Sequence, residues 1–160
     1  MLEGFEKDDS HISGKELADI ARYLQSNENI SNLVLKDAMY NSDGTPLALC
    51  FSNKNKSNEA IVAFKGTTGG EEWSDNVKGL NATDTSSQKE ALDFIESLPY
   101  IDITTVGHSK GGNKSMYVRI TSDKVKRSVS LGGQGFSQEF IDKYWAEIQM
   151  KGNGITNYSL

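Results

Sequence analysis

Residues 101–121 contain the feature that most restricts the fold of this chain. A run of strand-forming residues, 101–106, is followed by the pentapeptide G-H-S-K-G at 107–111 and by a helix predicted from Lys110 to about Thr121. A strand, a sharp turn and a helix in that order force the central serine into a strained backbone conformation. Glycines on both sides of it remove side chains that would clash there. The segment therefore predicts an α/β architecture with Ser109 at the end of a strand.

The same turn gives Ser109 the position of a catalytic nucleophile. The helix that follows directs its first amide groups towards the serine, where negative charge would develop on a substrate oxygen. A G-x-S-x-G sequence by itself occurs by chance in many glycine-rich loops. Here the strand and the helix can both be recognised, which favours catalysis by Ser109 over a glycine-rich turn without chemistry.

Hydrophobic periodicity predicts the other elements. We expect an amphipathic helix over residues 17–24 capped by Ser13, a hairpin of strands 47–51 and 60–64, a helix over 91–98 capped by Ser86 or Ser87, strands at 128–131 and 155–160, and a last helix capped by Ser137. Strands that alternate with helices after residue 60 indicate a mostly parallel sheet flanked by helices.

Composition excludes several classes of function. The 160 residues carry a net charge of −5 without a Lys/Arg cluster, so neither nucleic acid nor an anionic membrane is an expected partner. No apolar stretch approaches the roughly 20 residues of a membrane span, and the acidic N-terminus lacks a signal-peptide core. We expect a cytoplasmic location by default, with export without a cleaved signal left open. The single cysteine, Cys50, lies in an apolar strand pattern and is expected to be buried, so neither a disulfide nor a cysteine zinc site is implied.

Four spaced motifs resemble those of a known family. F-K-G-T at 64–67, W-S-D-N at 73–76, V-G-H-S-K-G-G-N at 106–113 and L-G-G-Q-G-F at 131–136 occur in the order seen in class 3 lipase-like α/β-hydrolases. The sequence is most similar to a bacterial branch with G-H-S-K-G-G-N at the nucleophile. The resemblance covers about residues 35–160, and it implies a single α/β-hydrolase-like domain over 1–160 with an N-terminal helical segment at 1–30.

The resemblance also implies roles for individual residues. It makes Ser109 the nucleophile, the Lys110 amide one oxyanion donor, Thr67 the second donor through its amide or hydroxyl, Asp75 the residue that orients this loop, and Gly107, His108 and Gly111 supports of the turn. The implied activity is that of a lipase or esterase, in which Ser109 attacks a lipid-like or small carboxylic ester. No metal and no organic cofactor is implied.

The sequence departs from this family in its catalytic base. In α/β-hydrolases the acid and then the histidine follow the serine, so the acid would come after a strand such as 155–158. The only histidines here are His11 and His108, and His108 is expected to face away from Ser109. Three explanations are open. The chain is a C-terminally truncated piece of a longer hydrolase, or the base comes from another chain or from His11 or Lys110, or the protein is an inactive relative that only binds.

Two other functions are alternatives to ester hydrolysis. Residues 107–115 approach the phosphate-binding pattern G-x-x-x-x-G-K-[ST], but Asn113 stands between Gly112 and Lys114 and would rotate the lysine by about 100° round the helix. The second alternative is a non-catalytic binding or interaction module on a hydrolase scaffold. Besides an ester substrate, the expected partner is a second copy in a homodimer or a complementing C-terminal segment.

Overall fold

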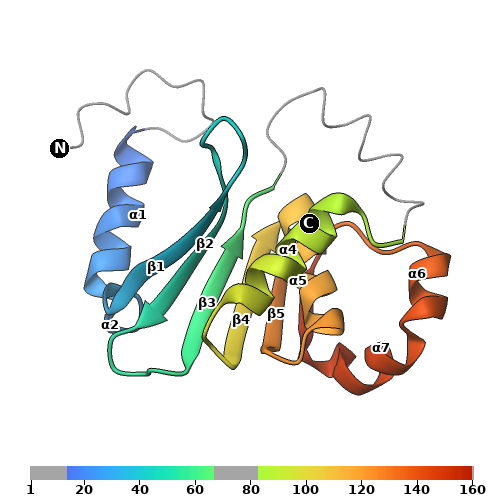
Figure 1. The fold of residues 1–160 in the computed structure, drawn as a ribbon. Helices are drawn as coiled ribbons and strands as arrows, with labels where there is room; N and C mark the ends of the chain where they lie inside the picture. The colour runs from blue at the N-terminus through green and yellow to red at the C-terminus, as the bar shows by residue number, and fades with distance from the viewer. Residues whose placement is uncertain (1–13, 67–82, 160) are drawn as a thin grey trace. The chain divides into compact units, whose positions relative to one another are not determined.

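The computed structural model of this chain describes residues 14–66 and 83–159. In chain order, the elements are α1 Gly14–Ser26, α2 Glu28–Ser31, β1 Leu33–Tyr40, β2 Pro46–Asn53, β3 Glu59–Phe64, α4 Ser86–Ser97, β4 Asp102–His108, α5 Lys110–Thr121, β5 Val125–Leu131, α6 Gln138–Lys143, α7 Trp145–Lys151, the 3₁₀ turn η1 Gly152–Gly154 and β6 Ile155–Tyr158 (Figure 1). The chain forms two compact units, Met1–Leu33 with α1 and α2, and Val34–Leu160 with the remaining helices.

The six strands form one mixed sheet in the order β1-β2-β3-β4-β5-β6. β2 and β3 are antiparallel, with Cys50 opposite Val62, which confirms the predicted hairpin. From β3 to β6 every neighbouring pair is parallel. The predicted fold class, an α/β fold with a mostly parallel sheet and flanking helices, is therefore confirmed. β1 was not among the predicted strands, because Lys36 and Asp37 interrupt its apolar pattern.

Helix α5 occupies the centre of the second unit. It packs against β3, β4 and β5 and also against α4 and α7 (Figure 1), and its bounds are those predicted from the sequence. Because α5 has neighbours on several sides, most of its residues are buried, including Tyr117 and Val118. These two side chains join Ile95 of α4, Ile103 of β4 and Phe140 of α6 in the hydrophobic core.

A chain of buried hydroxyl groups links α5 to the sheet. The Ser115 hydroxyl donates to Thr105 Oγ1 at 2.8 Å and lies 2.8 Å from Ser128 Oγ, while Thr105 donates to the Ser115 carbonyl at 3.2 Å. All three residues are almost fully buried. Since each of these three hydroxyls has a partner, their burial avoids the cost of an unpaired polar group.

Helix α4 begins differently from the prediction. Its cap is Thr85, whose hydroxyl accepts from the Gln88 amide, while the Gln88 side chain accepts from the Thr85 amide at 2.9 Å. The predicted caps, Ser86 and Ser87, lie inside the helix. The reason is a capping box, in which threonine and glutamine three residues apart satisfy each other's backbone groups. The predicted cap Ser13 of the first helix lies outside the described residues.

The last predicted helix is divided in two. Ser137 caps α6 as expected, by accepting from the Phe140 amide at 3.2 Å. The helix ends at Tyr144, whose backbone angles of −107° and 23° depart from helical values, and α7 starts directly after it. The hydroxyl of Tyr144 is held 2.9 Å from Asp84, on the segment before α4. A contact between distant segments thus coincides with the break, which local periodicity does not reveal.

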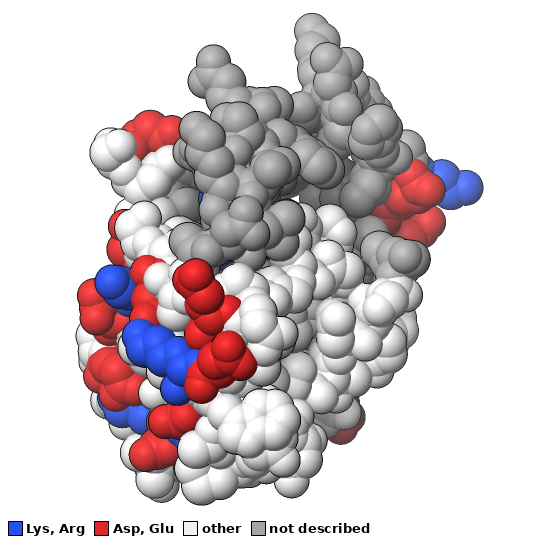
Figure 2. All heavy atoms as spheres, turned by 90° about the vertical axis from the view of Figure 1, so that its right-hand side faces the viewer, with Lys and Arg blue, Asp and Glu red and all other residues white. Residues whose placement is uncertain are grey.

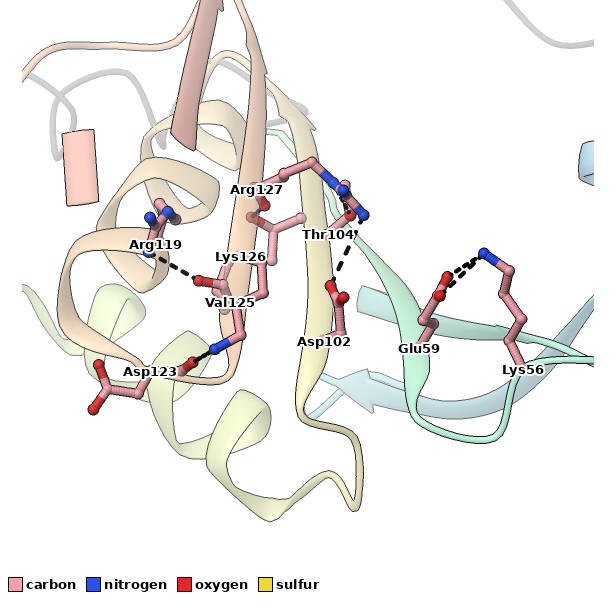
Figure 3. Close-up of polar contacts among 10 residues, drawn as sticks. Lys56, Glu59, Asp102, Thr104, Arg119, Asp123, Val125, Lys126 and Arg127 are labelled. Atoms are coloured by element: carbon pink, nitrogen blue, oxygen red, sulfur yellow. Dashed lines mark hydrogen bonds and ion pairs between the residues drawn. The ribbon is translucent and has the colours of Figure 1, made fainter. Parts of the chain in front are cut away.

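Charged side chains cluster at the amino ends of the strands (Figure 3). Arg127 pairs with Asp102 at 3.8 Å and donates to Thr104 at 3.1 Å, and Lys56 pairs with Glu59 at 2.9 Å. On the face drawn in Figure 2, acidic and basic side chains alternate without a basic patch. Among the described residues, no helix combines the length and the apolar character needed to cross a membrane.

Candidate active site

The carboxyl ends of four strands meet at one edge of the sheet. Phe64 at the end of β3 lies opposite Gly107, His108 at the end of β4 opposite Leu131, and Leu131 opposite Tyr158 at the end of β6. Backbone hydrogen bonds extend these pairings into the turns. The Ser109 amide donates to the Leu131 carbonyl at 2.9 Å, and the Gly132 amide donates to the Tyr158 carbonyl at 2.7 Å. Open α/β sheets place their ligand sites at this edge.

Ser109 has the strained backbone that its motif predicts. Its φ is 54° and its ψ is −122°, and among the described non-glycine residues only Asp84 shares a positive φ. A conformation of this kind costs of order 1–3 kcal/mol and persists only where its surroundings enforce it. Ser109 is the residue that precedes α5, yet its hydroxyl makes no capping hydrogen bond. The residue is partly exposed.

The two glycines of the motif are required by close backbone contacts. A Cβ atom on Gly107 would lie 2.3 Å from the carbonyl of Gly111, and a Cβ on Gly111 would lie 2.3 Å from the Phe64 carbonyl oxygen. Both contacts are with backbone atoms, which cannot move aside as a flexible side chain can. The G-x-S-x-G spacing thus allows β3, β4 and the start of α5 to approach each other closely.

The first turn of α5 supplies hydrogen-bond donors to this region. Lys110 is the first residue of the helix, where amide groups have no acceptor within the helix and the helix dipole is positive. The turn after β3 lies beside it, since a Cβ on Gly66 would stand 2.7 Å from the His108 carbonyl oxygen. Thr67 and Asp75, the other residues predicted for the oxyanion loop, lie outside the described residues.

Among the described residues, no general base is identified beside Ser109. His108 is the only histidine in the described part of the chain, and its side chain is exposed next to Gly66, where a Cβ would lie 3.8 Å from Nδ1. His11 lies outside the described residues. Burial, together with the charge of Asp37, raises the pKa of the Cys50 thiol to about 11, so Cys50 is no rival nucleophile near neutral pH. Within 14–66 and 83–159, no group of His, Cys, Asp and Glu could hold a metal ion.

A half-buried carboxylate, Asp84, has no sequence signal of its own. Asp84 accepts hydrogen bonds from the hydroxyls of Tyr117 at 3.0 Å and Tyr144 at 2.9 Å and pairs with Lys143. Partial burial raises the pKa of Asp84, but the hydrogen bonds from Lys143 and the two tyrosines outweigh it, so the net pKa lies below its ordinary value. Asp84 thus joins the start of α4 to α5 and α6 across more than 30 residues of sequence.

Comparison with solved structures supports this architecture. The chain is similar to the crystal structure of M37 lipase, with a TM-score of 0.56 and 15% sequence identity, over 98% of this chain and 63% of that chain. At this identity the likeness shows the fold alone. The chain spans 63% of the length of that lipase. No curated protein matched the sequence.

A family model matches most of the chain. The model described as Mbeg1-like matches residues 37–154, which include β2 to β5 and the turn that carries Ser109. This range is well over half of the chain. The protein belongs to the Mbeg1-like family.

Proposed function

We propose that this chain is a serine hydrolase of the lipase or esterase type, which acts on carboxylic esters through an acyl-enzyme on Ser109. The observation that carries the proposal is the backbone of Ser109, strained at the carboxyl end of β4 and followed at once by α5. A strand-to-helix turn of this kind exposes a serine hydroxyl in α/β-hydrolases. The lipase-like fold and the resemblance to class 3 lipases support the same activity.

The proposed reaction uses the donors at the amino end of α5. Ser109 Oγ attacks the ester carbonyl and loses its proton to a base, and the resulting oxyanion accepts from the Lys110 amide. A second donor would come from the turn after Phe64, where the sequence predicts Thr67. Each such donor contributes on the order of 3 kcal/mol to transition-state stabilisation. The alcohol leaves with the proton, and water then releases the acid from Ser109.

The base is the open part of this mechanism. We propose that it is a histidine supplied from outside the described residues, either His11 or one from a complementing segment or a second chain. His108 does not suit this role, because it is the neighbour of Ser109 in the turn and lies beside Gly66. A rival function is binding without catalysis, on the same scaffold. It is favoured by the fact that the described residues contain no second histidine.

A fluorophosphonate probe separates these two functions. Such a probe labels an activated serine covalently, and we expect labelling of the wild-type chain that disappears in Ser109→Ala. The matched control is Ser57→Ala, which removes an exposed serine in the β2–β3 turn and should leave labelling intact. A folded wild-type chain that stays unlabelled would rule out hydrolysis by this chain on its own, with His11 as the base, and would leave the binding function or a base from a complementing segment or a second chain. Loss of labelling in His11→Ala would identify His11 as the base.

A further inference from the structure

The side chain of Asn113 connects three segments around Ser109. Asn113 lies in the first turn of α5, and its Nδ2 donates to two successive carbonyls of the β5–α6 loop (residues 132–136), those of Gln134 at 3.0 Å and Gly135 at 3.1 Å. Its Oδ1 accepts from Gln88 Nε2, on α4, at 2.8 Å. Three hydrogen bonds therefore join α5 to a loop and to a second helix.

Gln88 determines which way the Asn113 amide points. The Gln88 side-chain oxygen is already engaged, since it accepts from the Thr85 amide within the capping box of α4. The NH₂ group on the other side of this planar amide therefore faces Asn113, which turns its oxygen towards α4 and its own NH₂ group towards the loop. Gln88 is 6% exposed, so an unmatched polar atom here would not be compensated by water.

The β5–α6 loop lies directly against the helix turn that would bind the oxyanion. A Cβ on Gly133 would stand 3.1 Å from the carbonyl carbon of Gly112 and 3.3 Å from the Asn113 amide nitrogen. At the entry of the loop, Leu131 accepts from the Ser109 amide at 2.9 Å. A displacement of the loop would therefore disturb Ser109 and the first turn of α5.

The loop is also held at its two ends, where the Gly132 amide donates to the Tyr158 carbonyl at 2.7 Å and the Phe136 ring stacks on Phe140 at 4.1 Å between centroids, so Asn113 holds its middle. Three of its five residues, 132, 133 and 135, are glycines, and glycine has more backbone freedom to lose than any other residue. Around Gly135 there is open space, with no atom within 4 Å of a built Cβ. Two hydrogen bonds from one rigid side chain to successive carbonyls restrict such a segment effectively.

We propose that Asn113, oriented by Gln88, is a positioning residue that fixes the β5–α6 loop against the first turn of α5 and so sets the reactivity of Ser109. Its effect on reactivity rests on the proposed hydrolase function, whereas its effect on the loop does not. The amide is required because it must donate to the loop and accept from Gln88 at once. A carboxylate of the same size can do only the second.

Asn113→Asp tests this role with two measurements. Hydrogen exchange should become faster in residues 132–136, because a carboxylate would face two carbonyl oxygens. The maximal rate at which a fluorophosphonate inactivates Ser109 should fall by about tenfold to a hundredfold, as expected for a misplaced catalytic group. The concentration of probe that gives half-maximal rate should change little, because the substitution leaves the space around Ser109 open.

Two controls distinguish positioning from a general loss of stability. Val118→Ala creates a cavity in the buried part of the same helix and should lower the melting temperature without a comparable fall in the inactivation rate. Asn55→Asp makes the same chemical change at an exposed position of the β2–β3 turn and should leave both measurements near wild type. The proposal is wrong if the loop amides of Asn113→Asp exchange no faster than those of wild type. It is also wrong if the probe inactivates Asn113→Asp no more slowly than Val118→Ala. If the wild type is never labelled, the hydrolase function of this chain on its own fails, and hydrogen exchange alone decides whether Asn113 positions the loop.

Discussion

The two ends of the parallel strands are built on different principles. At the carboxyl ends, backbones approach so closely that a Cβ on Gly107 or Gly111 would come within 2.3 Å of a backbone atom, and Ser109 is strained. At the amino ends, long charged side chains pair at the surface, as Arg127 does with Asp102 (Figure 3). Steric contacts thus dominate at one end and solvated ion pairs at the other.

Substitutions should therefore have unequal effects at the two ends. Exposed ion pairs contribute on the order of 0–1 kcal/mol, because water and salt screen them. A clash between backbone atoms is not relieved in this way, since the atoms concerned belong to strands and a central helix. The carboxyl end should therefore tolerate little change, although its described contacts are mainly steric.

The largest effect is expected at Gly111. Gly111→Val would place side-chain atoms against the Phe64 carbonyl, and we expect a loss of about 3 kcal/mol in the free energy of unfolding, together with loss of Ser109 labelling. Urea denaturation measures the first quantity. Wild-type stability in this variant would show that β3 and α5 lie farther apart than described.

At Asp84 we expect an effect smaller than at Gly111 and larger than at the exposed ion pairs. Asp84→Asn keeps the size of the side chain and suits the positive φ of 57°. It places an NH₂ group towards donors, so we expect a loss of about 2 kcal/mol. The exposed Asp123, paired with Lys151 at 2.7 Å, is the matched control, and its Asn variant should change the unfolding free energy far less. Equal losses in the two variants would contradict the role given to Asp84.

The pH dependence of stability gives a second test of Asp84. Its folded pKa is lowered, below an unfolded value of about 3.9, so its contribution is complete above that value and is lost as the pH falls through the folded pKa. Urea midpoints of wild type and Asp84→Asn should therefore differ most near neutral pH and converge in acid. A difference that stays constant down to pH 2.5 would contradict this linkage.

The smallest effect is expected at the amino ends. Arg127→Ala removes the pair with Asp102 and the hydrogen bond to Thr104, yet Arg127 is exposed and the two charged groups stand 3.8 Å apart, with Asp102 half-buried. We expect a change of less than about 1 kcal/mol and unaltered labelling of Ser109. If Arg127→Ala lowered the free energy of unfolding as much as Gly111→Val, the two ends of the strands would not differ in their sensitivity to substitution.

Local patterns predicted most of the second unit. The bounds of α5 and the pairing of β2 with β3 follow from periodicity, turn residues and glycine positions, all of which act over a few residues. β1 was missed because Lys36 and Asp37 break its alternation, and pairing with β2 provides the stabilisation that its own pattern does not reveal. Propensity and periodicity carry no information about such partners.

In the candidate site too, some features follow from local sequence and others from contacts between distant segments. The strained turn at Ser109 follows from the amino-acid sequence, since a positive φ flanked by two glycines is a property of five adjacent residues. The contacts of Asn113 with Gln88 and the β5–α6 loop, and of Asp84 with Tyr117 and Tyr144, depend instead on tertiary packing. These contacts join segments 20 or more residues apart. Their partners are set by how α4, α5 and α6 pack on the sheet, because a hydrogen bond forms only where packing has already brought donor and acceptor within reach.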